Sequence, residues 1–197
     1  KQHFSKLNLA LRGRHQRANA VLALAALELT EGSFSLSERV IRQGLQTVRW
    51  PGRLEVMLEQ PRVILDGAHN PEGVKALVDE LSDVRGQRKI SLLFATMADK
   101  DGEMMLRGRT KVGDKVVFTR VEMERSADPQ KLAQKMVEPI DHRVIPDPRA
   151  ALRTLLAEAR SDDMIVVAGS LYLLGEVRPM LEELAAAQTA GARTTQS

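Results

Sequence analysis

Four polar side chains of different chemistry lie close together along one part of the chain. Arg53 supplies a cation, Asp66 a carboxylate, His69 an imidazole and Asn70 an amide. An apolar run ends at Asp66, and a helix-like stretch begins at Pro71. Ligands of open α/β sheets bind at the carboxyl ends of strands, where a loop of this kind lies. The combination of groups suits a nucleotide or an anionic substrate.

The spacing of apolar residues divides the chain into a helical first part and an alternating second part. Helices are expected over residues 17–29 and 37–48, before Pro51-Gly52 interrupts the pattern. Strands are then expected over residues 54–58, 62–65, 90–96, 115–121, 143–145 and 164–168, and helices over 71–81, 102–106, 128–136, 148–159 and 171–186. This alternation predicts an α/β fold with a mainly parallel, Rossmann-like sheet and flanking helices.

Composition narrows the class of protein. A chain of 197 residues with 43% hydrophobic residues can bury a core of its own. It has no cysteine, which fits a reducing compartment, and we expect a cytoplasmic, monomeric protein. The longest apolar stretch, residues 20–27, is too short to span a bilayer. A net charge of +3 and an aromatic content of 3% argue against nucleic acid as a partner, despite a basic N-terminal stretch.

Four motifs, in order, resemble one enzyme family. They are Gly13-Arg14-His15-Gln16-Arg17-Ala18-Asn19-Ala20, then Trp50-Pro51-Gly52-Arg53 with Asp66-Gly67-Ala68-His69-Asn70-Pro71, then Met97-Ala98-Asp99-Lys100-Asp101, and finally Ala168-Gly169-Ser170-Leu171-Tyr172. Together they resemble the C-terminal part of folylpolyglutamate synthase/dihydrofolate synthase, a family of the Mur ligase superfamily. The resemblance implies an ATP-dependent ligase that joins L-glutamate to a folate through an acyl phosphate.

The resemblance also implies roles for single residues. Asn19, Arg53 and Asp66 match positions that contact ATP, with Asp66 suited to ribose hydroxyls and Arg53 to phosphate oxygens. His69 and Ser170 match positions near the incoming glutamate, and Arg53 and His69 are the catalytic candidates. Without the resemblance, Asp66 reads equally well as the cap of its loop, and Arg53 and Asn19 as surface residues. Asp99, Lys100 and Asp101 are given no catalytic role.

Two parts expected of such a ligase are absent from the sequence. The nearest approach to a phosphate-binding P-loop, residues 108–115, has Asp114 where a lysine belongs. No acidic cluster has convincing magnesium spacing. We therefore expect the C-terminal part of a longer ligase whose Mg²⁺ ligands lie upstream. Residues 1–49 would end the central ATPase domain, residues 50–187 would form the last domain, and residues 188–197 would form a flexible tail.

Three alternatives remain open at this stage. A peptidoglycan Mur ligase shares the fold. A stand-alone nucleotide-binding module predicts tight ATP binding by this chain alone. A nicotinamide-binding dehydrogenase domain is disfavoured because no Gly-x-Gly-x-x-Gly follows a strand.

Overall fold

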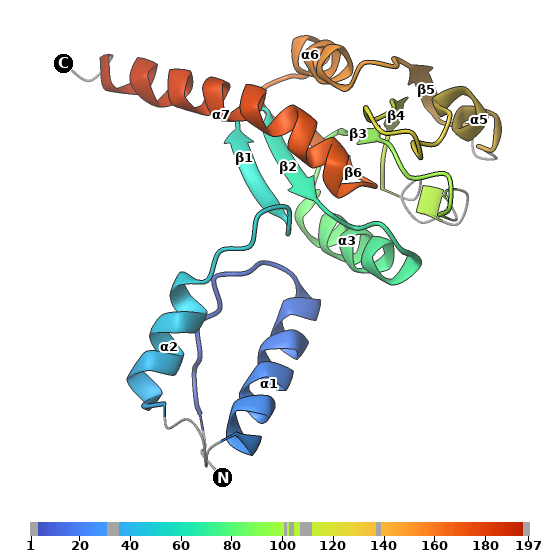
Figure 1. Cartoon of the computed structure of the whole chain (residues 1–197). Coiled ribbons are helices and arrows are strands. Elements are labelled where there is room, and N and C mark those ends of the chain that lie inside the picture. Colours follow the sequence, from blue (N-terminus) through green and yellow to red (C-terminus); the bar gives the residue numbers. More distant parts are fainter. Residues whose placement is uncertain are drawn as a thin grey trace.

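A computed structural model describes residues 4–30, 36–100, 102, 105–106, 112–136 and 139–194. Its centre is one six-stranded sheet, against which the later helices pack, while the first two helices project away from it (Figure 1). Among the described residues, no helix is long and apolar enough to cross a membrane.

The sheet has the strand order β1-β2-β6-β3-β4-β5. The strands are β1 (Glu55–Glu59), β2 (Arg62–Asp66), β3 (Ile90–Phe94), β4 (Lys115–Phe118), β5 (Asp141–Val144) and β6 (Met164–Ala168). Only β1 runs antiparallel, as a hairpin with β2, and the other neighbours are parallel. The carboxyl ends of β2, β6 and β3 therefore meet at one edge, where Asp66 pairs with Ala168 and Ala168 with Phe94.

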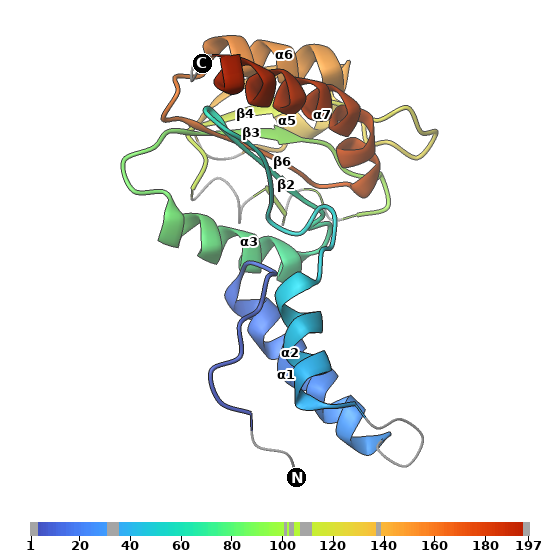
Figure 2. The ribbon, with the colours of Figure 1, turned by 90° about the vertical axis from the view of Figure 1, so that its left-hand side faces the viewer.

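Helices cover both faces of the sheet, as Figure 2 shows. The helices that follow the hairpin are α3 (Pro71–Val84), α5 (Pro129–Gln134), α6 (Pro148–Glu158) and α7 (Leu171–Thr194). Because successive side chains of a strand point to opposite faces, β6 divides its residues between two cores. Met164 and Val166 join the core that includes α3 and α5, and Ile165 and Val167 join the core under α6 and α7.

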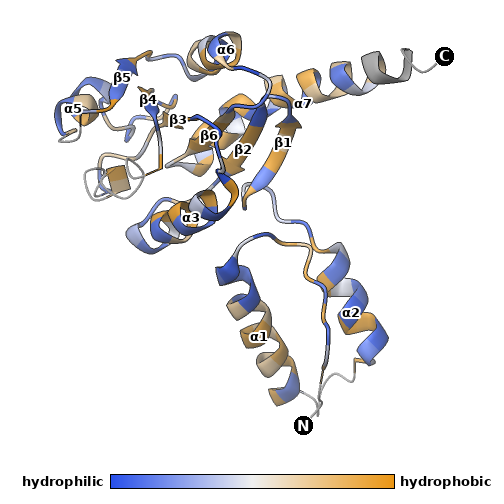
Figure 3. Ribbon diagram, turned by 180° about the vertical axis from the view of Figure 1, so that it is seen from behind, coloured by the Kyte–Doolittle hydropathy of each residue, from blue (hydrophilic) through white to orange (hydrophobic). Residues whose placement is uncertain are grey.

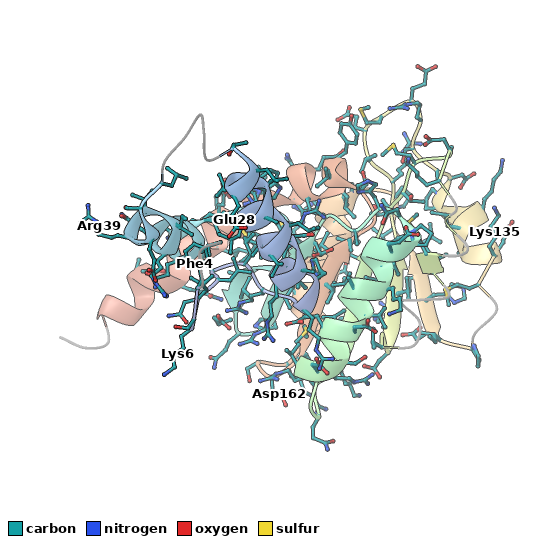
Figure 4. All side chains as sticks on the ribbon, turned by 90° about the horizontal axis from the view of Figure 1, so that it is seen from below. Phe4, Lys6, Glu28, Arg39, Lys135 and Asp162 are labelled. Atoms are coloured by element: carbon teal, nitrogen blue, oxygen red, sulfur yellow. The ribbon has the colours of Figure 1, made fainter. Side chains whose placement is uncertain are left out.

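The first part of the chain forms an arm beside α3, made of α1 (Arg14–Leu29) and α2 (Glu38–Thr47) (Figures 1 and 2). The side chain of Arg14 contacts that of Asp83 at 2.9 Å. The arm leaves apolar side chains in solvent. Figure 3 colours much of the α1 ribbon orange, which marks hydrophobic residues. Leu29 is 89% exposed, and Val21 and Leu22 are also exposed. Charged side chains such as Arg39, Lys135 and Asp162 project from the periphery (Figure 4).

The predicted α/β architecture is confirmed, with shifts at element ends. Asn70 caps α3 by accepting a hydrogen bond from the amide of Gly73 at 2.8 Å, and Pro71 is the first helical residue, as predicted. Ser37 precedes α2, but its side chain makes no capping bond. The helix predicted to end at residue 186 continues as α7 to Thr194, so residues 188–194 of the predicted flexible tail are helical. The helix expected over residues 102–106 lies partly outside the described residues.

Candidate active site

The predicted ATP-binding residues line one cleft. Its volume is about 610 Å³, and it lies between α1 and the loop that joins β2 to α3. Asn19 comes from α1, Arg53 from the link between α2 and β1, and Asp66 and His69 from the β2–α3 loop. The fold thus brings together residues that are up to 50 positions apart in the sequence.

Asp66 is held firmly at the floor of this cleft. Asp66 is the last residue of β2, and it is only 5% exposed. One carboxylate oxygen accepts the amide of Leu54 and the other accepts the amide of Ala68, both at 2.9 Å. Asp66 therefore fastens the Arg53 segment to its own loop, which is the capping role that the sequence left open.

Arg53 is a half-buried cation with no partner in the part of the chain that the structure describes. No hydrogen bond or ion pair joins its guanidinium to any other described residue. The backbone on both sides is unusual, because Gly52 and Leu54 have φ angles of 71° and 47°. A lone guanidinium beside a cleft can bind phosphate oxygens with two parallel N–H bonds.

Asn19 belongs to a short polar chain along the first turns of α1. Its amide nitrogen donates to the side-chain oxygen of Gln16 at 3.2 Å, and the Gln16 amide lies 3.0 Å from a ring nitrogen of His15. All three residues line the cleft, and Gln16 is the buried residue of α1. The sequence motif contained His15 and Gln16, but nothing in their types distinguished them from surface residues.

His69 lies between this cleft and a second pocket. Its Nδ1 is 2.8 Å from the carbonyl oxygen of Gly67, so this nitrogen donates its proton there. In the neutral ring Nε2 is then left as an acceptor. His69 also lines the second pocket, of about 240 Å³, beside the loops that follow β3 and β6. One side chain is therefore shared by the two pockets.

Ser170 lies in the wall of the second pocket, immediately before α7. The residue is 3% exposed, and its Oγ accepts the amide of Tyr172 at 3.2 Å. Two cations that sequence reasoning left without a role, Lys100 and Arg125, also line this pocket. Arg125 is in none of the four motifs, and it arrives here because the amide of Ala98 donates to its carbonyl oxygen at 2.8 Å. Asp101 lies outside the described residues.

The described residues offer no metal-binding cluster of three or more His, Cys, Asp or Glu side chains. We therefore assign no metal ligand to them. Asp114, which breaks the P-loop-like pattern, has a structural role instead. Its carboxylate accepts the amide of Ile90 at 2.7 Å and pairs with Arg85 at 2.6 Å. Most of the remaining P-loop-like segment lies outside the described residues.

Known proteins resemble this chain in sequence and in fold. A dihydrofolate synthase/folylpolyglutamate synthase of Bacillus subtilis is 29% identical over 181 residues, which are 91% of this chain and 42% of that protein. A bifunctional folylpolyglutamate synthase/dihydrofolate synthase of Yersinia pestis, solved with AMPPNP and a Mn ion, superposes with a TM-score of 0.82 at 32% identity, over 92% of this chain and 42% of that one. A further such structure, with Mn, AMPPNP and L-glutamate bound, has a TM-score of 0.81 at 32% identity and the same coverage.

The chain spans about two fifths of the length of these proteins. The family described as Mur ligase, glutamate ligase domain, matches residues 52–171. That segment contains all six strands of the sheet, the Arg53 and Asp66 loops and the Gly169–Ser170 turn. The chain therefore belongs to the Mur ligase glutamate ligase domain family.

Proposed function

We propose that this chain is part of an ATP-dependent ligase that adds L-glutamate to folates. The observation that carries the proposal is the pair of adjoining pockets that share His69. The larger one gathers the residues matched to ATP contacts, and the smaller one gathers Ser170 and two cations. A ligase of this type needs a nucleotide and an amino acid side by side, and two joined pockets meet that need.

In the larger cleft, Arg53 binds phosphate oxygens, Asp66 accepts ribose hydroxyls and Asn19 holds the nucleotide from the opposite wall. The guanidinium of Arg53 is free to do this, since no other described residue occupies it. Charge redistributes over the phosphate oxygens during phosphoryl transfer, and a fixed cation stabilises that change. Magnesium, which the ligase class requires, would shield the phosphates, with its ligands supplied from outside the described residues.

In the smaller pocket, glutamate brings two carboxylates to Ser170, Lys100 and Arg125. The γ-phosphoryl group of ATP is first transferred to an oxygen of the folate carboxylate. The glutamate amine then attacks the acyl carbon, the C–O bond to phosphate breaks, and inorganic phosphate leaves. Nε2 of His69 is placed as an acceptor for a proton of the glutamate ammonium group. Exclusion of water protects the acyl phosphate from hydrolysis.

We also propose that residues 1–49 end a central ATPase domain and that residues 50–187 form the last domain. The exposed apolar side chains of Val21, Leu22 and Leu29 support this assignment, because a helix of a complete domain normally covers such residues. A further domain that packs against α1 would complete the nucleotide cleft.

Substrate turnover tests the proposal. The full-length protein that carries this chain should consume ATP when both a folate and L-glutamate are present, and release ADP and phosphate. UDP-muramyl peptides should not replace the folate. Turnover with the muramyl substrate alone would assign the chain to the peptidoglycan branch. Tight ATP binding by these 197 residues alone would favour a stand-alone nucleotide-binding module.

A further inference from the structure

Because no other described residue binds the side chain of Arg53, its direction depends on the backbone that carries it. Leu54, the residue that follows, has a left-handed φ of 47°. This backbone conformation is unfavourable for residues other than glycine. A conformation of this kind persists only where the surroundings hold it. The groups that hold residues 52–55 therefore determine where the guanidinium lies.

Two carboxylates bind the amides on either side of Arg53. Asp66 accepts the amide of Leu54 at 2.9 Å, and Glu55 accepts the amide of Gly52 at 2.6 Å. The carbonyl of Gly52 in turn accepts the amide of Gly67 at 2.7 Å. The short Arg53 segment is thus tied at three points, and Glu55 supplies one of them.

Glu55 is itself held by Arg178 of α7. The two terminal nitrogens of the Arg178 guanidinium donate to the two carboxylate oxygens of Glu55, at 3.0 and 2.5 Å. Both side chains are about three quarters buried. Hydrogen bonding from Arg178, opposed in part by burial, keeps the pKa of Glu55 below its ordinary value. The Gly52 amide therefore meets a charged acceptor at neutral pH.

Leucine side chains of the first turn of α7 also pack closely against Gly52 and Gly67, which belong to the loops of the larger cleft. A Cβ on Gly52 would lie 2.7 Å from a methyl group of Leu174, and one on Gly67 would lie 2.5 Å from a methyl group of Leu171. Arg178 stands two turns along α7 from Ser170, which lines the smaller pocket. One helix thus connects the amino-acid pocket with the Arg53 segment.

We propose that Glu55 and Arg178 are positioning residues, which hold Arg53 toward the nucleotide and tie its segment to the helix that begins at Ser170. The inference rests on the proposed ligase function. It predicts that loss of the ion pair impairs catalysis through Arg53. A displacement of about 1 Å in a catalytic group can cost on the order of 10²-fold in rate.

A double-mutant cycle in the full-length protein tests this assignment. Glu55→Gln should lower kcat about 10-fold or more while the KM for glutamate changes little. In an Arg53→Ala background the same change should have less than about a twofold effect, because the group that it positions is gone. Arg178→Lys, which keeps the charge but loses the planar fork, should recover part of the rate lost in Arg178→Ala.

Glu59→Gln is the matched control. Glu59 is on the same strand as Glu55 and pairs with Arg62 at 2.8 Å, but it does not line either pocket. Its kcat should stay within about twofold of wild type. If Glu55→Gln lowers kcat by the same factor with and without Arg53, the positioning role is overturned. Unchanged kcat in Glu55→Gln overturns it as well.

Turnover by the wild-type protein distinguishes a failure of this inference from a failure of the proposed ligase function. Wild-type turnover together with an ineffective Glu55→Gln change would overturn the positioning role alone. Absence of wild-type turnover with folate and glutamate would overturn the proposed function and the inference that rests on it. If Glu55→Gln fails to fold, the comparison of Arg178→Lys with Arg178→Ala decides the question.

Discussion

Arg53 combines a firmly held backbone with a guanidinium that none of the other described residues binds, and this combination is suited to transition-state stabilisation. In the full-length protein, Arg53→Ala should reduce kcat by on the order of 10²-fold, as for the removal of an oxyanion donor. Arg53→Lys should recover only part of the rate, because an ammonium lacks the two-pronged geometry. Single-turnover kinetics measures the chemical step. A wild-type rate in Arg53→Ala would mean that Arg53 is a surface residue.

Asp66 should contribute to the stability of the fold as well as to ATP binding. In Asp66→Asn one oxygen becomes an NH₂ group, which cannot accept a backbone amide, so Leu54 or Ala68 loses its partner. We expect the free energy of unfolding to fall by about 1–3 kcal/mol, measured by urea denaturation. Asp162→Asn, at an exposed position, is the matched control, and equal losses in the two variants would contradict the prediction.

Arg125 is a candidate binding residue that the structure reveals and the sequence motifs did not. Its guanidinium has no partner among the described residues and lines the pocket that holds Ser170. Arg125→Ala should raise the KM for glutamate about 10-fold or more, the loss expected for one charged hydrogen bond. The KM for ATP should not change. Arg160→Ala, which removes an exposed arginine outside the two pockets, should leave both constants unaltered.

At the scale of single elements, replacing two glycines near the start of α7 by alanine should change the stability of the fold in opposite directions. Gly169, which follows the last residue of β6, has a φ of 115°, and a Cβ there would lie 2.1 Å from the carbonyl oxygen of Ala95. Gly169→Ala should therefore destabilise the fold by more than about 2 kcal/mol. Gly175 lies inside α7 with no atom within 4 Å of a new Cβ, so Gly175→Ala should stabilise it by about 0.5–1 kcal/mol. Urea midpoints of both variants measure the two effects.

The elements were largely predictable because periodicity is local. The alternation of β2 through α7, and the Asn70-Pro71 start of α3, follow from patterns within a few residues. The family motifs were needed to group Asp66, Arg53 and Asn19. No local sequence pattern indicates that α1 lies beside the β2–α3 loop. The position of Arg125 and the link from Glu55 to Arg178 depend on tertiary contacts 27 and 123 residues apart, which no single-sequence pattern reveals.

The whole molecule should lose stability in acid partly through Glu55. Hydrogen bonding from Arg178 keeps the pKa of Glu55 lower in the folded state than in the unfolded state. A carboxylate of this kind stabilises the fold above its unfolded pKa of about 4.3, and the contribution disappears as pH falls through the folded pKa. The wild type should therefore be more stable than Glu55→Gln at neutral pH, and this difference should shrink below about pH 4. Denaturation at several pH values measures it, and parallel profiles would contradict it.

The two pockets also differ in a way that has a practical use. The chain has one tryptophan and one tyrosine. Trp50, which is 63% exposed, lines the larger cleft, and Tyr172 lines the smaller pocket. Each proposed ligand would therefore meet its own natural chromophore. Nucleotide binding can be followed by selective excitation of the indole, and amino-acid binding by the phenol absorption, without attaching a dye.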